Sequence, residues 1–299
     1  MTSSIPNVLT LPSNACLDLY PDNVIGRYTV KLPHPLELEG DHEVALTGMV
    51  YPISWYNFPQ GRVYSLSIKV IHTADHVRED GPESHEDEVE EGDIVNRDAE
   101  EEGEDEGQPA RLHYNRKVVL RPGHYGSPDK VMDILNAKAV PSGVRFIYSS
   151  ITQRVTVKTV TGRPSTILSV ELVLSPDLAY KLGWPDVEQG LVLAHQSSRI
   201  VSPGVMNLEE VEVLYVNCDL ASPSHVVGSS LVPLLKTVAV KGQYGAAVQF
   251  EPMVLDWIPV RHRRITTASV LITDSTGRLV PFERGRCSVK VHLRRRVAP

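Results

Sequence analysis

The stretch Cys287-Ser288-Val289-Lys290-Val291-His292-Leu293 indicates the fold class, because every second side chain in it is apolar. A period of two is what an extended strand shows when only one of its faces is buried. The same alternation predicts further strands with apolar positions at Val44, Leu46 and Val50; Tyr64, Leu66, Ile68 and Val70; Val155 and Val157; Leu168, Val170, Leu172 and Leu174; Val211, Val213 and Tyr215; and Ala268, Val270 and Ile272. Turn residues such as Asp274-Ser275-Thr276-Gly277 separate these strands, so we predict an all-β protein built as an antiparallel sandwich or barrel.

Two short helices interrupt the strand pattern. Ser127-Pro128-Asp129 and Ser175-Pro176-Asp177 each offer an N-cap residue, a proline at the first helical position and an acid that favours the helix dipole. Apolar residues then recur on one helical face, and Gly183 is the expected end of the second helix. We expect both helices to cover sheet edges.

Charge is distributed very unevenly along the 299 residues, whose net charge is −7. Glu79 to Glu106 contain sixteen Asp or Glu and one basic residue, Arg97, which gives −15 and leaves +8 for the remainder. With almost no apolar residue, this stretch cannot offset the entropy of ordering. We therefore predict a single domain over residues 1–299 in which residues 79–107 form a long, mobile, disordered acidic insertion. The segment from Arg261 to Pro299 has ten Lys or Arg against two acids, and we interpret it as a basic end.

Several classes of chemistry lack support in the sequence. Cys16, Cys218 and Cys287 are far apart and odd in number, which argues against a disulfide framework or a thiolate zinc site. No nucleophile elbow, nucleotide-binding loop or zinc-protease motif is present. His72 with His76 is a weak metal candidate, and His124 is a weak candidate for a general base. We therefore predict no enzyme activity, no metal and no cofactor, and the absence of a long apolar run predicts no membrane contact.

Two surface candidates remain. Trp55, Tyr56 and Phe58 form an aromatic cluster that either packs at the end of a sandwich or anchors a protein partner. Arg294, Arg295 and Arg296 directly follow the last predicted strand. They are either a solvated tail or a contact for a polyanion, such as packaged DNA, or for an acidic neighbour.

Short blocks in a characteristic order resemble the minor capsid, or penton, proteins of Maverick/Polinton elements and adintovirus-like viruses. The blocks are Leu11-Pro12-Ser13-Asn14, Tyr20-Pro21-Asp22-Asn23, residues 28–33 and 36–40, Glu43 to Leu46 with Tyr51-Pro52 and Trp55-Tyr56-Asn57, Arg121 to Tyr125, Leu178 to Trp184, Val213 to Val216 with Cys218-Asp219, Leu234-Leu235-Lys236 and Pro281 to Gly285. They cover most of the chain outside the acidic insertion, which is not a feature that we associate with this family.

The resemblance implies a jelly-roll β-sandwich and a structural role in the virion, with assembly inside the host cell. Five copies would form a pentamer at each icosahedral vertex, beside a double-jelly-roll major capsid protein, and no catalytic site would be present. Two alternatives remain open. One is a cellular β-sandwich module that recognises a peptide or carbohydrate through the loops around Trp55, and the other is a jelly-roll metalloenzyme of the cupin type.

Overall fold

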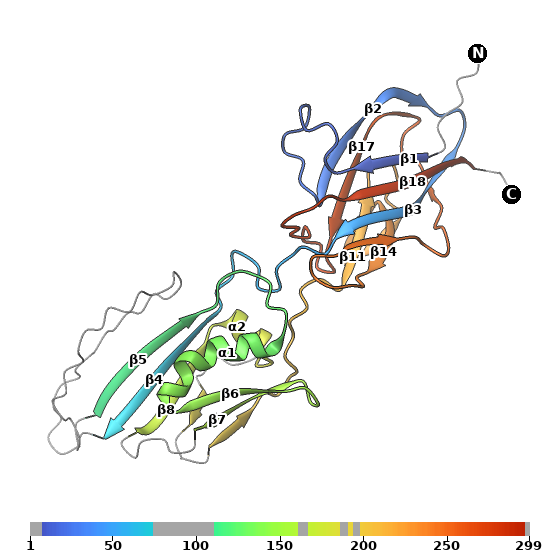
Figure 1. The fold of residues 1–299 in the computed structure, drawn as a ribbon. Helices are drawn as coiled ribbons and strands as arrows, with labels where there is room; N and C mark the ends of the chain where they lie inside the picture. The colour runs from blue at the N-terminus through green and yellow to red at the C-terminus, as the bar shows by residue number, and fades with distance from the viewer. Residues whose placement is uncertain (1–7, 74–110, 161–166, 186–190, 194–197, 297–299) are drawn as a thin grey trace. The chain divides into compact units, whose positions relative to one another are not determined.

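A computed structural model describes residues 8–73, 111–160, 167–185, 191–193 and 198–296. The chain divides into two compact units: unit 1 comprises Met1–Tyr56 with Glu209–Pro299, and unit 2 comprises Asn57–Leu208. Each unit has its own hydrophobic core, and Figure 1 shows the strands and helices of both units. The structure thus has two units where we expected one domain. The sequence hides the division because both units alternate with the same period.

Unit 1 is a sandwich of two antiparallel sheets. The first sheet has the order β1 (Val8–Pro12), β18 (Ser288–Arg295), β3 (His42–Pro52) and β15 (Ala247–Phe250), with β16 (Ile258–Pro259) also paired to β3. The second has the order β14 (Leu234–Ala239), β11 (Val213–Cys218), β17 (Arg264–Thr273) and β2 (Arg27–Glu37). A separate hairpin joins β12 (His225–Val227) to β13 (Ser230–Val232).

The order of these strands is that of a jelly roll, which confirms the predicted fold class. Except for the neighbours β11 and β14, consecutive main strands lie in opposite sheets, and the first strand pairs with the last. Eight strands in two four-stranded sheets with these crossings make two Greek keys. Unit 2 is inserted between β3 and β11.

Two predicted strand faces of unit 1 were wrong. Val50 is 41% exposed, although Val44 and Leu46 are buried, because the pairing of β3 with β18 shifts by one residue at Thr47. A bulge of this kind moves every later side chain to the other face. In β11 the buried apolar residues are Leu214, Val216 and Cys218, whereas Tyr215 faces outward and is only half-buried. Apolar residues occupy both faces of β11, so alternation alone could not assign them.

Unit 2 has two sheets and two helices around one core. The sheets have the orders β5 (Arg111–Val119), β4 (Ser65–Thr73), β8 (Ile167–Leu174), β9 (Leu191–Leu193), and β10 (Arg199–Val201), β7 (Arg154–Thr159), β6 (Val144–Ser149). The helices are α1 (Pro128–Ala139), followed by the 3-10 turn Val140–Ser142, and α2 (Pro176–Lys181). The predicted acidic insertion lies outside the described residues. It connects β4 to β5, which pair as neighbours up to Thr73 and Arg111.

Both predicted helices are confirmed, although their serines act differently from the prediction. Neither Ser127 nor Ser175 caps its helix through the hydroxyl group. The Ser175 hydroxyl instead donates to the Val63 carbonyl at 2.6 Å and accepts from the Ser65 N–H at 2.9 Å, which attaches α2 to the start of β4. The α1 helix is held by the side-chain amide of Asn136, which makes two hydrogen bonds to the backbone of Phe146 in β6.

Gly183 ends α2 as predicted, in a left-handed conformation with φ of +87°. The N–H groups of Gly183 and Trp184 donate to the carbonyls of Tyr180 and Ala179, which is the Schellman arrangement. A Cβ on Gly183 would lie 2.5 Å from the Gly204 carbonyl oxygen, a distance too short for any side chain. Only glycine therefore fits at this crossing of two loops.

We predict that Gly183→Ala destabilises unit 2 by about 2 kcal/mol or more, because it adds both a clash and backbone strain. Urea unfolding followed by circular dichroism measures the loss. Gly126→Ala is the control, since a Cβ there meets no atom within 4 Å. Equal stability of the two variants would contradict the proposed close approach.

Candidate functional site

The unit boundary divides the aromatic cluster between two separate cores. Trp55 is 6% exposed in the core of unit 1, with its ring 5.6 Å from that of Phe282. Phe58 is fully buried in unit 2, where its ring lies 4.7 Å from Tyr64 and 4.8 Å from Tyr125. The core-packing interpretation therefore holds for Trp55 and Phe58, and only Tyr56 stays half-buried.

Residues next to the boundary secure the start of unit 2. The side-chain amide of Asn57 makes two hydrogen bonds of 2.9 Å to the backbone of Tyr125, and Phe58 exchanges backbone hydrogen bonds with Gly123. The turn from Arg121 to Gly126 thus acts as a structural clamp. Burial, followed by the charge of Lys130, lowers the pKa of His124 in this turn.

The three C-terminal arginines lie differently from the prediction. Arg294 and Arg295 belong to β18, and only Arg296 follows the strand. Arg294 donates through two nitrogens to one carboxylate oxygen of Glu43, at 3.0 and 2.9 Å, and stacks 3.8 Å above the Trp257 ring. Arg296 lies 3.8 Å from the other oxygen of Glu43.

These contacts alter the interpretation of the arginines as a polyanion site. All three side chains are exposed, but Glu43 partly neutralises Arg294 and Arg296. A guanidinium held by a carboxylate and an aromatic ring is a packing element of the strand end. Arg295 forms no ion pair with any carboxylate whose side chain the structure describes.

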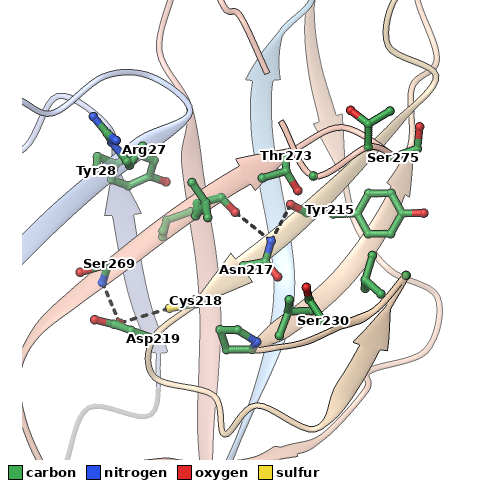
Figure 2. Close-up of a pocket in the computed structure, with 18 of the residues that line it drawn as sticks. Arg27, Tyr28, Tyr215, Asn217, Cys218, Asp219, Ser230, Ser269, Thr273 and Ser275 are labelled. Atoms are coloured by element: carbon green, nitrogen blue, oxygen red, sulfur yellow. Dashed lines mark hydrogen bonds between the residues drawn. The ribbon is translucent and has the colours of Figure 1, made fainter. Parts of the chain in front are cut away.

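A pocket of about 580 Å³ lies on the outer face of the sheet β14-β11-β17-β2, beside the β12–β13 hairpin. Figure 2 shows Asn217 of β11 among the lining side chains, with Tyr215 and Thr273 on one side and Ser269 and Asp219 on the other. Arg27 and Arg261 also line it. Apolar walls with a few polar groups are typical of a site that binds a ligand or a partner side chain.

Asn217 is the unusual group of this pocket. Its Nδ2 donates to the carbonyls of Tyr215 and Leu271, at 3.2 and 3.4 Å, which turns Oδ1 away from both. Oδ1 is buried and has no partner among the described residues. A buried acceptor without a donor is costly. No sequence signal marked Asn217, because its importance depends on what surrounds it in the folded sheet.

The other polar groups of the pocket bond to the sheet and to one another. Asp219 Oδ1 accepts the Ser269 N–H at 2.7 Å, and the hydroxyls of Thr29 and Ser269 bond to each other at 3.0 Å. Burial raises the pKa of the Cys218 thiol to about 12.

Within the described ranges, no three His, Cys, Asp or Glu side chains gather as metal ligands. His76 lies outside those ranges.

No helix in the described part of the chain is long and apolar enough to span a membrane.

Comparisons with known proteins give a structural likeness of low identity. The sequence matches no protein-family model and no curated protein. Among solved structures, the chain is similar to the crystal structure of the mavirus penton protein, with 8% sequence identity and a TM-score of 0.49. The alignment covers 96% of this chain and 99% of that one.

We predict that Arg294→Lys lowers the free energy of unfolding of unit 1 by about 1 kcal/mol. Lysine keeps the charge but loses the two-nitrogen contact with Glu43 and the flat stacking on Trp257. Chemical unfolding followed by tryptophan fluorescence measures both the stability and the environment of the ring. Arg295→Lys is the matched control, and an equal effect of both substitutions would show that Arg294 has no special role.

Thiol accessibility gives a second test. Burial raises the pKa of Cys218 and Cys287 to about 12, whereas Cys16 is partly exposed. We expect an aromatic disulfide reagent at pH 8 to modify one thiol per native chain, at Cys16, and three after denaturation. Rapid modification of two or more thiols in the native protein would contradict the described packing.

Proposed function

We propose that the protein is a structural capsid component, a penton-like protein that forms pentamers at icosahedral vertices beside a double-jelly-roll major capsid protein. The jelly-roll order of the strands in unit 1 carries this proposal, together with the ordered sequence blocks that resemble the penton family. Jelly rolls also occur in lectins and cupins, so the strand order supports the capsid role by analogy of fold. The protein would act in the virion, through its shape and without catalysis.

A ring of five copies needs two different surfaces on each subunit that fit each other. Two pairs are the most exposed large apolar residues of the described part of unit 1. Val226 and Leu231 lie opposite each other on the β12–β13 hairpin and are 72% and 60% exposed. Met253 and Val254, between β15 and β16, are fully exposed and 70% exposed, respectively. Exposed apolar side chains of this kind are typical of contact surfaces, so we assign the ring contact to these two pairs.

The hairpin also needs a partner for its own stability. It has strands of three residues and pairs with no other strand in the described structure. An isolated two-stranded hairpin is marginal in water, and packing against a neighbouring subunit would stabilise it.

The alternative of a ligand-binding module is favoured by one observation, the pocket beside Asn217 with its buried unpaired oxygen. The Trp55 ring itself is inside the core. Retention of a host glycoprotein or peptide by monomeric protein, with no ring formation, would support this alternative.

We predict pentamers of the purified protein at high concentration, visible as fivefold rings by negative staining and as a fivefold mass by mass photometry. Leu231→Asp and Met253→Asp should each raise the dissociation constant about tenfold or more, because each places a charge in an apolar contact. At a concentration low enough for all proteins to be monomeric, the melting temperature should stay unchanged. Ile151→Asp is the control, since Ile151 is 93% exposed on unit 2. A protein that stays monomeric and also fails to bind the major capsid protein would exclude the proposal.

A further inference from the structure

Three cations lie in one row across the small sheet of unit 2. Arg145 of β6 pairs directly with Lys158 of β7, which pairs on its other side with Arg199 of β10. All three side chains are exposed, whereas the alternate residues Phe146 and Val157 point into the core. The row therefore lies on the outer face of the sheet, whose strands β6 and β7 are labelled in Figure 1.

Such a row works against the stability of the sheet. Neighbouring strands are about 4.8 Å apart, so the three charges lie within a span of about 10 Å. Like charges directly opposite each other on two strands are destabilising. No carboxylate of the described residues forms an ion pair with Arg145, Lys158 or Arg199. An anionic partner from outside the described residues would remove this repulsion.

The net charge of the described part of unit 2 also favours an anionic partner. Among the side chains of unit 2 that the structure describes, twelve are Lys or Arg and four are Asp or Glu. Unit 1, in contrast, has fourteen of each sign over its full sequence. The basic excess outside the acidic stretch thus belongs to unit 2, and the sequence places the −15 stretch in the same unit.

We propose that the cationic row formed by Arg145, Lys158 and Arg199 binds the acidic segment Glu79–Glu106 of the same chain. The segment is joined to the unit at Thr73 and Arg111, which are paired neighbours. Between them lie 37 residues, and half of that length extends up to about 60 Å. A compact unit of this size has a radius of gyration of about 15 Å, so every face of unit 2 is within reach.

Nucleic acid is the competing occupant, and one general argument and one observation disfavour it. A tethered polyanion acts at an effective concentration of about a millimolar, and a phosphate backbone would have to displace it. The outward residues beside the row, Ile147, Thr156 and Val201, include no aromatic ring on which a base could stack. The inference goes beyond the proposed capsid role and does not depend on it.

Carbodiimide coupling tests the contact in the full-length protein. The reagent joins a lysine amine to a nearby Asp or Glu carboxylate as an amide and leaves as its urea. At low salt we expect mass spectrometry to find Lys158 joined to residues within 79–106. Arg145→Ser with Arg199→Ser should lower this yield about fivefold, through the loss of two exposed ion pairs, and 1 M salt should suppress it.

Three controls make the result specific. Lys158→Arg keeps the charge but cannot couple, so it should abolish the product and leave the melting temperature unchanged. Coupling at the exposed Lys117 and Lys130 gives the background level of non-specific coupling in the same sample. A mixture of copies labelled with ¹⁴N and ¹⁵N separates products within one chain from products between chains.

The outcomes are decisive in both directions. Products within one chain that depend on Arg145 and Arg199 support the inference. Products between chains would assign the row to a second copy and overturn it, as would coupling of Lys158 no higher than that of Lys117 and Lys130. We also expect a short single-stranded DNA to bind more tightly to a variant with all sixteen acids of the segment changed to Asn or Gln than to the native protein. Equal binding to the two proteins would overturn the inference.

Discussion

Unit 1 depends on the antiparallel register that places the last strand between two early ones. β18 pairs with β1 on one edge and with β3 on the other, so residues almost 290 positions apart share a sheet. The N–H of Cys287 donates to the Ser13 hydroxyl, and the Tyr28 hydroxyl reaches across the sandwich to the Leu11 carbonyl. Burial raises the pKa of Tyr28 strongly, consistent with a hydroxyl enclosed between the sheets. The sandwich is therefore incomplete until the C-terminal strand has joined it.

This register has consequences for the order of folding. Unit 2 is continuous in sequence, so its contacts close over shorter loops than those between β1 and β18. Loop-closure entropy must be overcome before distant contacts contribute stability. We therefore expect unit 2 to fold first and the two segments of unit 1 to pair with each other afterwards. Because the entropic cost rises only with the logarithm of loop length, an insertion of this size between β3 and β11 is tolerated.

The sequence predicts the fold class well and the surfaces poorly, for a physical reason. Alternation marks residues such as Val289 and Val291, since burial of one face dictates a period of two. The same rule fails at Val50, where a bulge shifts the phase, and at Tyr215, where both faces are apolar. It also joined Trp55 and Phe58 into one cluster, because adjacency along the chain does not show that two cores divide there.

Surface sites depend on register, which a single sequence does not encode locally. Arg145, Lys158 and Arg199 are separated by 13 and 41 positions and become neighbours only because β7 lies between β6 and β10. Arg294, Arg295 and Arg296 are adjacent in sequence, yet Glu43 and Trp257 engage the first and Glu43 also approaches the third. Folding can thus neutralise a charge cluster that is evident in the sequence. Conversely, the row of Arg145, Lys158 and Arg199, which forms no ion pair with a described carboxylate, arises from charges that are isolated in the sequence. The charge clusters on the described surface thus follow from strand pairing more than from composition, and the basic excess outside the acidic stretch lies in unit 2, inserted between two strands of unit 1.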